Sequence, residues 1–329
     1  MPHSGLLTTR QPSSSRSMGL RGNIRQQMLG LREITMRTAF YLPIAAMSLV
    51  GACATAPSES LATSDVLIAN RLLANRMVAS RLFANRLSTR PLVAGRMSPS
   101  SMAVNMSTAG RMLASEDGRE VFSALVSCAF PADVLLTATV GGLSLEFPGE
   151  LGLAPQWAWA PLDRAGQGWV SACMFARVNA RDVAIPISMR GPNLLLAVDA
   201  DERMDWALEE GAFFGNFFGP IDQPLQWFAC RGRDQVAGEG GNLANRLCTV
   251  PDPANPGFTM CGMTFAGDCG SFASDRVCET FSQRGTFYQR CHSAPLQSQC
   301  HDHGQHEAEQ STGTLVAVFD QVITTFVTP

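Results

Sequence analysis

The chain has 329 residues, enough for one large domain or two ordinary ones. Apolar residues make up 46% of it, which is normal for a globular protein and excludes a wholly disordered chain. The net charge of -3 conceals an asymmetry: residues 1–114 carry 13 Arg and three acidic residues, whereas residues 115–329 carry 12 Arg and 25 acidic residues. Because duplex binding needs a positive footprint, the acidic part argues against nucleic acid as a partner.

Residues 36–53 have the organisation of a secretory signal. Met36-Arg37 supplies a positive start, an apolar run follows from Ala39 to Val50, and small residues precede Cys53. Residues 1–35 are polar and show no core pattern. We therefore expect the first 35 residues to be disordered or to precede the true start of the protein.

The stretch Val50-Gly51-Ala52-Cys53 resembles the lipobox of bacterial lipoproteins, in which an aliphatic residue and two small residues precede a cysteine. The resemblance implies cleavage before Cys53, diacylation of its thiol, and anchoring in the outer membrane or at the cell surface. Ala54, in place of Asp, agrees with outer-membrane sorting in that family. The alternative is an ordinary signal cut after Ala52, Ala54 or Ala56, in which Cys53 has no role.

Residues 54–114 contain a five-residue repeat of the form Ala-Asn-Arg-Leu, which starts at Ala69 and returns at Ala109-Gly110-Arg111-Met112. In a helix, five residues turn through about 500°, so each unit is displaced by about 140° and repetition alone forms no apolar stripe. A pentapeptide-type β-solenoid is the alternative, but here Ala stands three positions before Leu, whereas that family places its small residue two before. We therefore expect a flexible or partly helical tether.

The tether is strongly basic, with no acidic residue between residues 66 and 115. Beside a lipid anchor, such a segment is expected to attract anionic lipid or polysaccharide, or to dock on the chain's own acidic domain. A solvated spacer is the alternative. The basic residues are Arg71, Arg76, Arg81, Arg86, Arg90, Arg96 and Arg111.

Residues 115–329 are predicted to form a single α+β domain that is β-rich in its second half, because strands and helices do not alternate regularly. Asp117 and Glu120 resemble a capping box ahead of apolar residues at helical spacing. The segments 134–140 and 143–147 flank Gly141-Gly142, which predicts a strand pair. Further helices are expected at 161–177 and 203–210, and further strands at 183–189, 194–198, 225–230, 246–250, 259–265 and 315–327.

Four short motifs between residues 122 and 231 carry a second resemblance. They are Phe147-Pro148-Gly149, Gly152-Leu153-Ala154-Pro155, Trp169-Val170-Ser171-Ala172-Cys173 and Glu210-Gly211-Ala212-Phe213. On these motifs the domain is similar to exported proteins of myxobacteria that have no assigned activity. The resemblance implies export and leaves function open.

Nine cysteines follow Cys53, and we expect most of them to form disulfides, because an exported protein folds in an oxidising compartment. Cys128 paired with Cys173 would join two predicted helices, whereas the remaining connectivity cannot be deduced from sequence. Because nine is odd, at least one thiol stays free or pairs between chains when Cys53 is lipidated. The nine are Cys128, Cys173, Cys230, Cys248, Cys261, Cys269, Cys278, Cys291 and Cys300.

A metal site is a sharper hypothesis for the C-terminal tail. His301, His303 and His306, with the carboxylates beside them, offer ligands for Zn²⁺ or Cu²⁺. No Cys-x-x-Cys accompanies them, and His306-Glu307 lacks the second histidine of a zinc-protease motif. A solvated acidic loop fits this segment equally well. We therefore expect no cofactor, with zinc or copper as the alternative.

Cys173 is the candidate for thiol chemistry. Gln167 stands six residues before it, as in papain-like proteases, which would make Cys173 a nucleophile and His301 its base. Three residues, Val170, Ser171 and Met174, depart from that family's signature. A buried or disulfide-bonded helix residue is the simpler interpretation.

Residues 211–220 form the densest aromatic stretch. Together with Trp157, Trp159 and Trp227, this stretch can be interpreted in two ways. In the first interpretation, these side chains line a groove for carbohydrate or peptide. In the second, which we favour, they belong to the core and flank tight turns. The sequence thus predicts an exported, lipid-anchored cell-envelope protein with a non-enzymatic binding or structural domain and an unknown protein partner. The alternative is a metal-dependent or thiol enzyme.

Overall fold

A computed structural model of the chain describes residues between 73 and 329, which belong to one compact unit. Helices and strands both contribute, and strands dominate the second half, so the α+β prediction is confirmed. Among the helices that the structure describes, none has both the length and the apolar character needed to span a membrane. The described residues are 73–98, 100–180, 184–238, 240–270, 276–280, 286–294 and 316–329.

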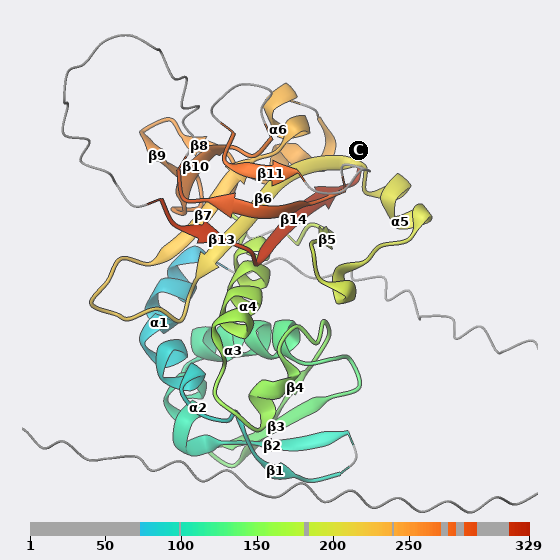
Figure 1. The fold of residues 1–329 in the computed structure, drawn as a ribbon. Coiled ribbons are helices and arrows are strands. Elements are labelled where there is room, and N and C mark those ends of the chain that lie inside the picture. Colours follow the sequence, from blue (N-terminus) through green and yellow to red (C-terminus); the bar gives the residue numbers. More distant parts are fainter. Residues whose placement is uncertain are drawn as a thin grey trace, which may run out of the picture. The chain divides into compact units, whose positions relative to one another are not determined.

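The first half of the unit combines helices with a four-stranded sheet in the order β1-β2-β3-β4 (Figure 1). Strands β2 and β3 are parallel, whereas the other neighbours are antiparallel. The elements are α1 (Ala74–Ser88), β1 (Val93–Arg96), β2 (Ser101–Val104), α2 (Met106–Leu113), α3 (Glu116–Ala129), β3 (Leu135–Val140), β4 (Leu143–Pro148), η1 (Pro155–Ala158) and α4 (Arg164–Ala176).

The second half holds a seven-stranded sheet, β5-β14-β6-β7-β10-β9-β8, and a three-stranded sheet, β11-β12-β13. Only β7 and β10 pair in parallel among these described strands. The elements are β5 (Ser188–Arg190), η2 (Leu194–Leu196), α5 (Ala200–Asp205), β6 (Leu208–Asn216), β7 (Gln226–Arg231), α6 (Arg233–Ala237), η3 (Gly241–Asn245), β8 (Pro251–Asp252), β9 (Asn255–Thr259), β10 (Thr264–Asp268), β11 (Cys278–Thr280), β12 (Tyr288–His292), β13 (Val318–Phe319) and β14 (Val322–Val327).

The basic repeat is partly helical, as predicted, because α1 covers three of its units. Met77, Ala84 and Leu87 are fully buried, and Ser80 is nearly so. These positions are spaced by three or four residues, so the apolar stripe takes different members of the repeat on successive turns. The β-solenoid alternative does not hold for this segment. The structure adds that α1 packs against α2 and α3, which extends the globular region beyond the expected boundary at residue 115.

The clearest local patterns of the domain give the expected elements. Helix α3 forms where the apolar spacing predicts it, although Ser115, not Asp117, is its N-cap and accepts a hydrogen bond from the Gly118 amide. Strands β3 and β4 pair around Gly141 and Gly142, whose φ angles of 59° and 84° suit a tight hairpin turn. Helix α4 begins after Asp163, whose carboxylate caps it.

Three predicted elements are wrong. The expected strand at 194–198 is the 3-10 helix η2, since Asn193 accepts a hydrogen bond from the Leu195 amide and closes a turn. The expected helix at 203–210 ends at Asp205 because Asp199 caps it early, and β6 starts at Leu208. No strand occurs at 246–250, where the Arg246 side chain is fully buried and bonds to main-chain carbonyls.

Three other predicted strands are shorter or divided. The segment 183–189 has a strand only at β5, within its described part. The segment 259–265 is split between β9 and β10 by a turn at Gly262, whose φ is 77°. The segment 315–327 is split between β13 and β14 at residues 320–321.

The seven-stranded sheet separates two hydrophobic cores. Successive side chains of a strand point to opposite faces, so β6 sends Phe213 into one core and Ala212 and Phe214 into the other. Helix α4 packs against β6 and β14 in the first core, which we call the large core. The small sheet β11-β12-β13 encloses the second, which we call the small core. The aromatic stretch 211–220 is therefore core, as favoured.

Candidate functional site

The small sheet β11-β12-β13 has two chemically different faces. Cys278 lies opposite Cys291, and Glu279 lies opposite Arg290, on the paired strands β11 and β12. Because side chains alternate along a strand, the two cysteines point to one face and the two charged residues to the other. The cysteines are fully buried in the small core, whereas Glu279 and Arg290 are 41% and 47% exposed.

A groove of about 260 Å³ lies beside the charged face of the small sheet. The Trp169 side chain reaches it from α4, and Asp320 from the turn between β13 and β14. Arg290 Nε donates to Asp320 Oδ1 over 2.6 Å. That hydrogen bond, together with the charge of Asp320, raises the pKa of Arg290, so the guanidinium stays positive. The full lining is Trp169, Pro192, Glu279, Gln289, Arg290 and Asp320.

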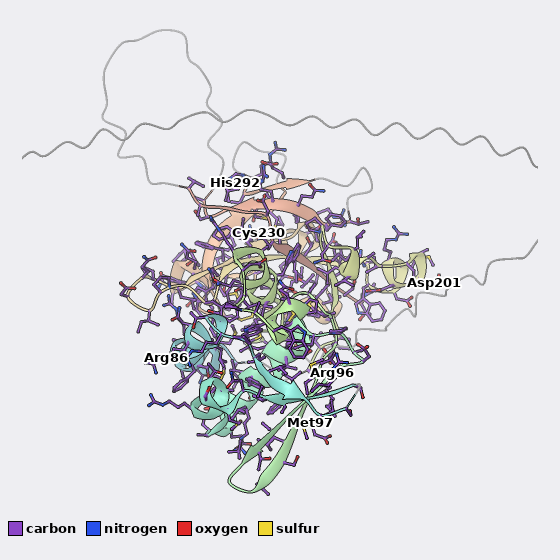
Figure 2. All side chains as sticks on the ribbon, turned by 60° about the horizontal axis from the view of Figure 1, so that its bottom comes forward. Arg86, Arg96, Met97, Asp201, Cys230 and His292 are labelled. Atoms are coloured by element: carbon purple, nitrogen blue, oxygen red, sulfur yellow. A yellow bond between two sulfur atoms is a disulfide. The ribbon has the colours of Figure 1, made fainter. Side chains whose placement is uncertain are left out.

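His292 lies at the rim of the same face, on the end of β12. Its Nε2 atom is 3.5 Å from Glu279 Oε1, which is too long for a good hydrogen bond. That nitrogen is buried and has no hydrogen-bond partner. Figure 2 shows His292 and Cys230 at the same end of the molecule, on the side of the small sheet. The three histidines that the sequence singles out, His301, His303 and His306, lie outside the described residues.

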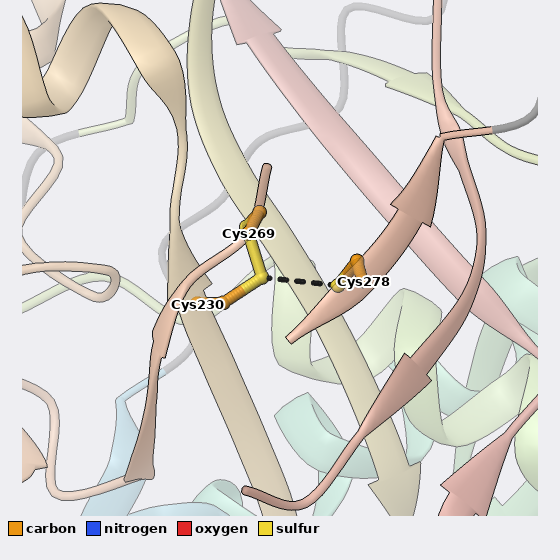
Figure 3. A group of neighbouring side chains, drawn as sticks. All are labelled: Cys230, Cys269 and Cys278. Atoms are coloured by element: carbon orange, nitrogen blue, oxygen red, sulfur yellow. Dashed lines mark hydrogen bonds between the residues drawn. A yellow bond between two sulfur atoms is a disulfide. The ribbon is translucent and has the colours of Figure 1, made fainter. Parts of the chain in front are cut away.

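Two disulfides lie in contact beneath the small sheet. Cys230 of β7 pairs with Cys269, and Cys278 of β11 pairs with Cys291 of β12. The Sγ atoms of Cys230 and Cys278 are 3.4 Å apart (Figure 3). The Sγ atoms of Cys230, Cys269 and Cys278 all lie within 4.8 Å of one another. We call these four cysteines the sulfur cluster.

The other two disulfides stand apart from this cluster. Cys128 pairs with Cys173 and joins α3 to α4, as predicted. Cys248 pairs with Cys261 in the loops that precede β8 and follow β9. Eight of the nine candidate cysteines are therefore disulfide-bonded, and the ninth, Cys300, lies outside the described residues. Because the Cys173 sulfur is in a disulfide, the interpretation of Cys173 as a thiol nucleophile is contradicted.

A buried ion pair connects α4 to the large sheet. Glu210 of β6 and Arg246 have fully buried side chains, and Arg246 Nε donates to Glu210 Oε2 over 3.0 Å. The guanidinium also donates to the carbonyls of Ala176 and Val178, over 2.9 and 3.0 Å, at the C-terminus of α4. A cation is favourable there because the last helical carbonyls lack partners. Arg246 therefore holds the end of α4 on the sheet, a role that was not predicted from the sequence.

Part of the basic repeat also docks on the acidic domain, one of the destinations that its charge predicts. Arg76 forms ion pairs with Glu120 and, over 3.1 Å, with Asp117. Arg81 donates from Nη2 to the carbonyls of Pro220 and Gln223, over 2.7 and 2.9 Å. The later arginines of the repeat are exposed, and two of them, Arg86 and Arg96, are labelled in Figure 2. The first described arginines of the repeat, Arg76 and Arg81, therefore bond to other parts of the protein.

The remaining candidates divide between core, surface and segments outside the described residues. Trp157 is fully buried and Trp227 is 9% exposed, so both belong to the large core. Trp159 is 55% exposed and does not line the groove. The aromatic residue of the groove is Trp169. The sequence placed Trp169 only within the expected helix at 161–177. Cys53, His301, His303 and His306 lie outside the described residues.

Comparison with known proteins gives no relative from which this site could be interpreted. No protein-family model matches the chain, no curated protein is significantly similar to it, and no solved structure matches its fold.

Proposed function

We propose that the protein is an exported, lipid-anchored component of the bacterial cell envelope with a non-enzymatic binding domain. The observation that carries this proposal is the state of the cysteines: eight of the ten in the chain form four disulfides. Disulfides persist in secreted and periplasmic compartments and are rare in the cytosol. The lipobox-like stretch ending at Cys53 supplies the anchor, with the membrane as its partner.

The groove beside the small sheet is the proposed binding site. Trp169 offers an apolar aromatic face, while Glu279, Gln289 and Arg290 offer hydrogen-bond acceptors and donors around it. Ligand sites commonly combine apolar surface with a few polar groups that fix orientation. A saccharide presents both an apolar ring face and many hydroxyl groups. We therefore propose a saccharide of the envelope as the ligand.

The lipid anchor is tested by expressing the full chain in a Gram-negative host and fractionating the cells. We expect the protein in the membrane fraction, with diacylglycerol on an N-terminal peptide that starts at Cys53 in mass spectra. The Cys53→Ala variant should be released or retained uncleaved, whereas the matched Cys300→Ala variant should fractionate like the parent. Unmodified Cys53 in a processed, soluble protein would contradict the anchor and leave export by an ordinary signal.

The binding site is tested by titrating the protein with N-acetylglucosamine oligomers and with glycan chains released from peptidoglycan. Loss of an aromatic contact worth about 0.5–1.5 kcal/mol should weaken binding by up to about tenfold in Trp169→Ala. Trp159→Ala removes an exposed tryptophan outside the groove and should leave affinity unchanged. Equal weakening by both variants, or no binding by the parent, would reject the proposed ligand class.

Two other proposals concern segments that this site does not include. The exposed Arg86, Arg90, Arg96 and Arg111 are proposed to attract anionic lipid or polysaccharide beside the anchor. A metal-dependent enzyme using His301, His303 and His306, with zinc or copper, stays the alternative hypothesis. Metal analysis of the natively purified chain and of its His301→Ala/His303→Ala variant tests it, because only a histidine site would lose metal in the variant.

A further inference from the structure

The four disulfides differ in one respect that sequence does not show. In the sulfur cluster, two disulfides touch, and their nearest atoms are Cys230 Sγ and Cys278 Sγ, 3.4 Å apart. Neither Cys128–Cys173 nor Cys248–Cys261 belongs to such a group among the described residues. A new bond between Cys230 and Cys278 would need their sulfur atoms to approach by only about 1.4 Å, since a disulfide bond is about 2.05 Å long.

The surroundings of the cluster keep the two disulfides in this arrangement. All four cysteines are fully buried, and the apolar side chains of Phe214, Ala266 and Val277 belong to the same small core. The Cys278 amide donates to the Cys269 carbonyl over 2.9 Å, which fixes the main chain of the two segments side by side. The contact between the disulfides therefore follows from the strand arrangement.

We propose that the sulfur cluster is a thiol–disulfide exchange site, at which a two-electron reduction by a dithiol moves the remaining disulfide to Cys230–Cys278. The proposal rests on the geometry of the cluster and is independent of the groove's ligand. Exchange proceeds by attack of a thiolate on a disulfide sulfur, so an opened disulfide placed against an intact one supplies the nucleophile within the fold.

In the first route, the Cys278–Cys291 disulfide opens. One thiolate of the dithiol attacks Cys291 Sγ and releases Cys278 as a thiolate; the second thiolate of the reagent then frees Cys291 as a thiol and leaves the reagent oxidised. The Cys278 thiolate attacks Cys230 Sγ, and the bond between Cys230 and Cys269 breaks. The electron pair stays on Cys269 Sγ, which takes up a proton.

In the second route, the Cys230–Cys269 disulfide opens first. The Cys230 thiolate then attacks Cys278 Sγ and displaces Cys291. Both routes end in the same product, a Cys230–Cys278 disulfide with Cys269 and Cys291 as thiols, because the touching atoms belong to Cys230 and Cys278. The product ties β11 to β7 of the seven-stranded sheet and removes the covalent link between β11 and β12, next to Glu279 and Arg290 of the groove.

The test is limited reduction of the folded full chain followed by trapping. Free thiols are first blocked with N-ethylmaleimide, dithiothreitol is added until less than one disulfide opens per molecule, and new thiols are labelled with iodoacetamide. Peptide mapping without further reduction should find the label on Cys269 and Cys291 together, with a peptide pair linked through Cys230 and Cys278. Label on Cys278 with Cys291, or on Cys230 with Cys269, and no crossed product would overturn the proposal.

The isolated disulfides serve as the internal control, because Cys248 and Cys261 should be labelled only as a pair. Single variants test the exchange without a reductant. In Cys291→Ala, the unpaired Cys278 should displace Cys269, so label should appear on Cys269 as well as on Cys278. In the matched Cys261→Ala variant, label should stay on Cys248. Label confined to Cys278 in Cys291→Ala, with Cys230–Cys269 intact, would overturn the proposal.

Discussion

The two faces of the seven-stranded sheet are stabilised in different ways. Among the described residues, the large core on the α4 face contains 48 buried apolar residues, four of which are disulfide-bonded cysteines. The small core under β11-β12-β13 contains ten, and again four are disulfide-bonded cysteines. A small layer cannot bury enough apolar surface to offset the entropy of ordering its chain, so covalent links replace packing there. The comparison explains why four cysteines gather under the small sheet.

Removing the sulfur cluster should have the largest effect. In the chain-entropy model, closing loops of 39 and 13 residues contributes about 4 and about 3 kcal/mol. The variant in which Cys230, Cys269, Cys278 and Cys291 are all Ala should lose up to about 7 kcal/mol, and β11 and β12 should lose hydrogen-exchange protection before the large core does.

The matched variant on the other face carries Cys128→Ala and Cys173→Ala. Its loop of 45 residues contributes about 4 kcal/mol, and the surrounding apolar contacts of α3 and α4 remain. We expect cooperative unfolding at lower denaturant concentration, with the small sheet still protected until the chain unfolds. If both variants lost protection in the same segments and to the same degree, the contrast between the two faces would be refuted.

Arg246→Met tests the buried ion pair that fastens α4 to the large sheet. The variant leaves the Glu210 carboxylate buried without its cation, which should cost about 3–5 kcal/mol in urea unfolding. The double variant Glu210→Met/Arg246→Met should recover part of this loss, because no charge is left unpaired. As a control, Arg233→Met removes a cation whose side chain is 68% exposed and should change stability by less than about 0.5 kcal/mol.

The Leu87→Ala variant tests whether the repeat helix α1 packs into the large core or only precedes the domain. Leu87 is fully buried in α1, so its truncation should cost about 3 kcal/mol, as for other buried leucines. Val78 lies on the same helix and is 50% exposed, so Val78→Ala should change the midpoint little. Thermal unfolding of the two variants decides the matter: equal midpoints would mean that α1 contributes no packing.

The smallest effect concerns Tyr288 in the small core, whose hydroxyl donates to Glu209 Oε1 over 2.6 Å. Burial, and then the charge of Glu209, raises the pKa of Tyr288, so the folded state disfavours tyrosinate. An unfolded tyrosine ionises at a pKa of about 10, so this contribution to stability is complete below pH 10 and is lost as the pH rises further.

Phenolate absorbance measures this directly, because Tyr288 is the one tyrosine in the sequence after the proposed cleavage before Cys53. We expect Tyr288 to ionise only when the protein unfolds and not near pH 10. Tyr288→Phe should remove the delayed step and, through the lost hydrogen bond, cost about 1 kcal/mol at neutral pH. Ionisation of Tyr288 near pH 10 in the folded protein would show that it is not buried as described.

The sequence predicts well where local chemistry and tertiary packing agree. Helix α3 and the hairpin at Gly141 and Gly142 follow from apolar spacing and turn residues alone. Strand β6 could not be predicted in this way, because Glu209 and Glu210 are typical of a helix surface. They are buried strand residues only because they bond to Tyr288 and Arg246, which lie far away in the chain.

The candidate site shows the same limit. The pairing of Cys128 with Cys173 was foreseen from two helices, whereas the contact between Cys230 and Cys278 depends on how β7 meets β11. The groove joins Trp169 of α4 with residues of β11 and β12 that lie more than a hundred positions later. No periodicity or spacing in one sequence encodes such an encounter, so the groove could not be predicted.

The central claim is that the domain is locked by four particular disulfides. The most direct measurement is disulfide mapping of the full chain, purified without reductant and digested after free thiols are blocked. The account predicts the peptide pairs Cys128–Cys173, Cys230–Cys269, Cys248–Cys261 and Cys278–Cys291, with label limited to Cys300, because the Cys53 thiol carries the proposed lipid. Blocked thiols at any of the other eight positions in the native protein would contradict the disulfide-locked domain, and with it the argument for export.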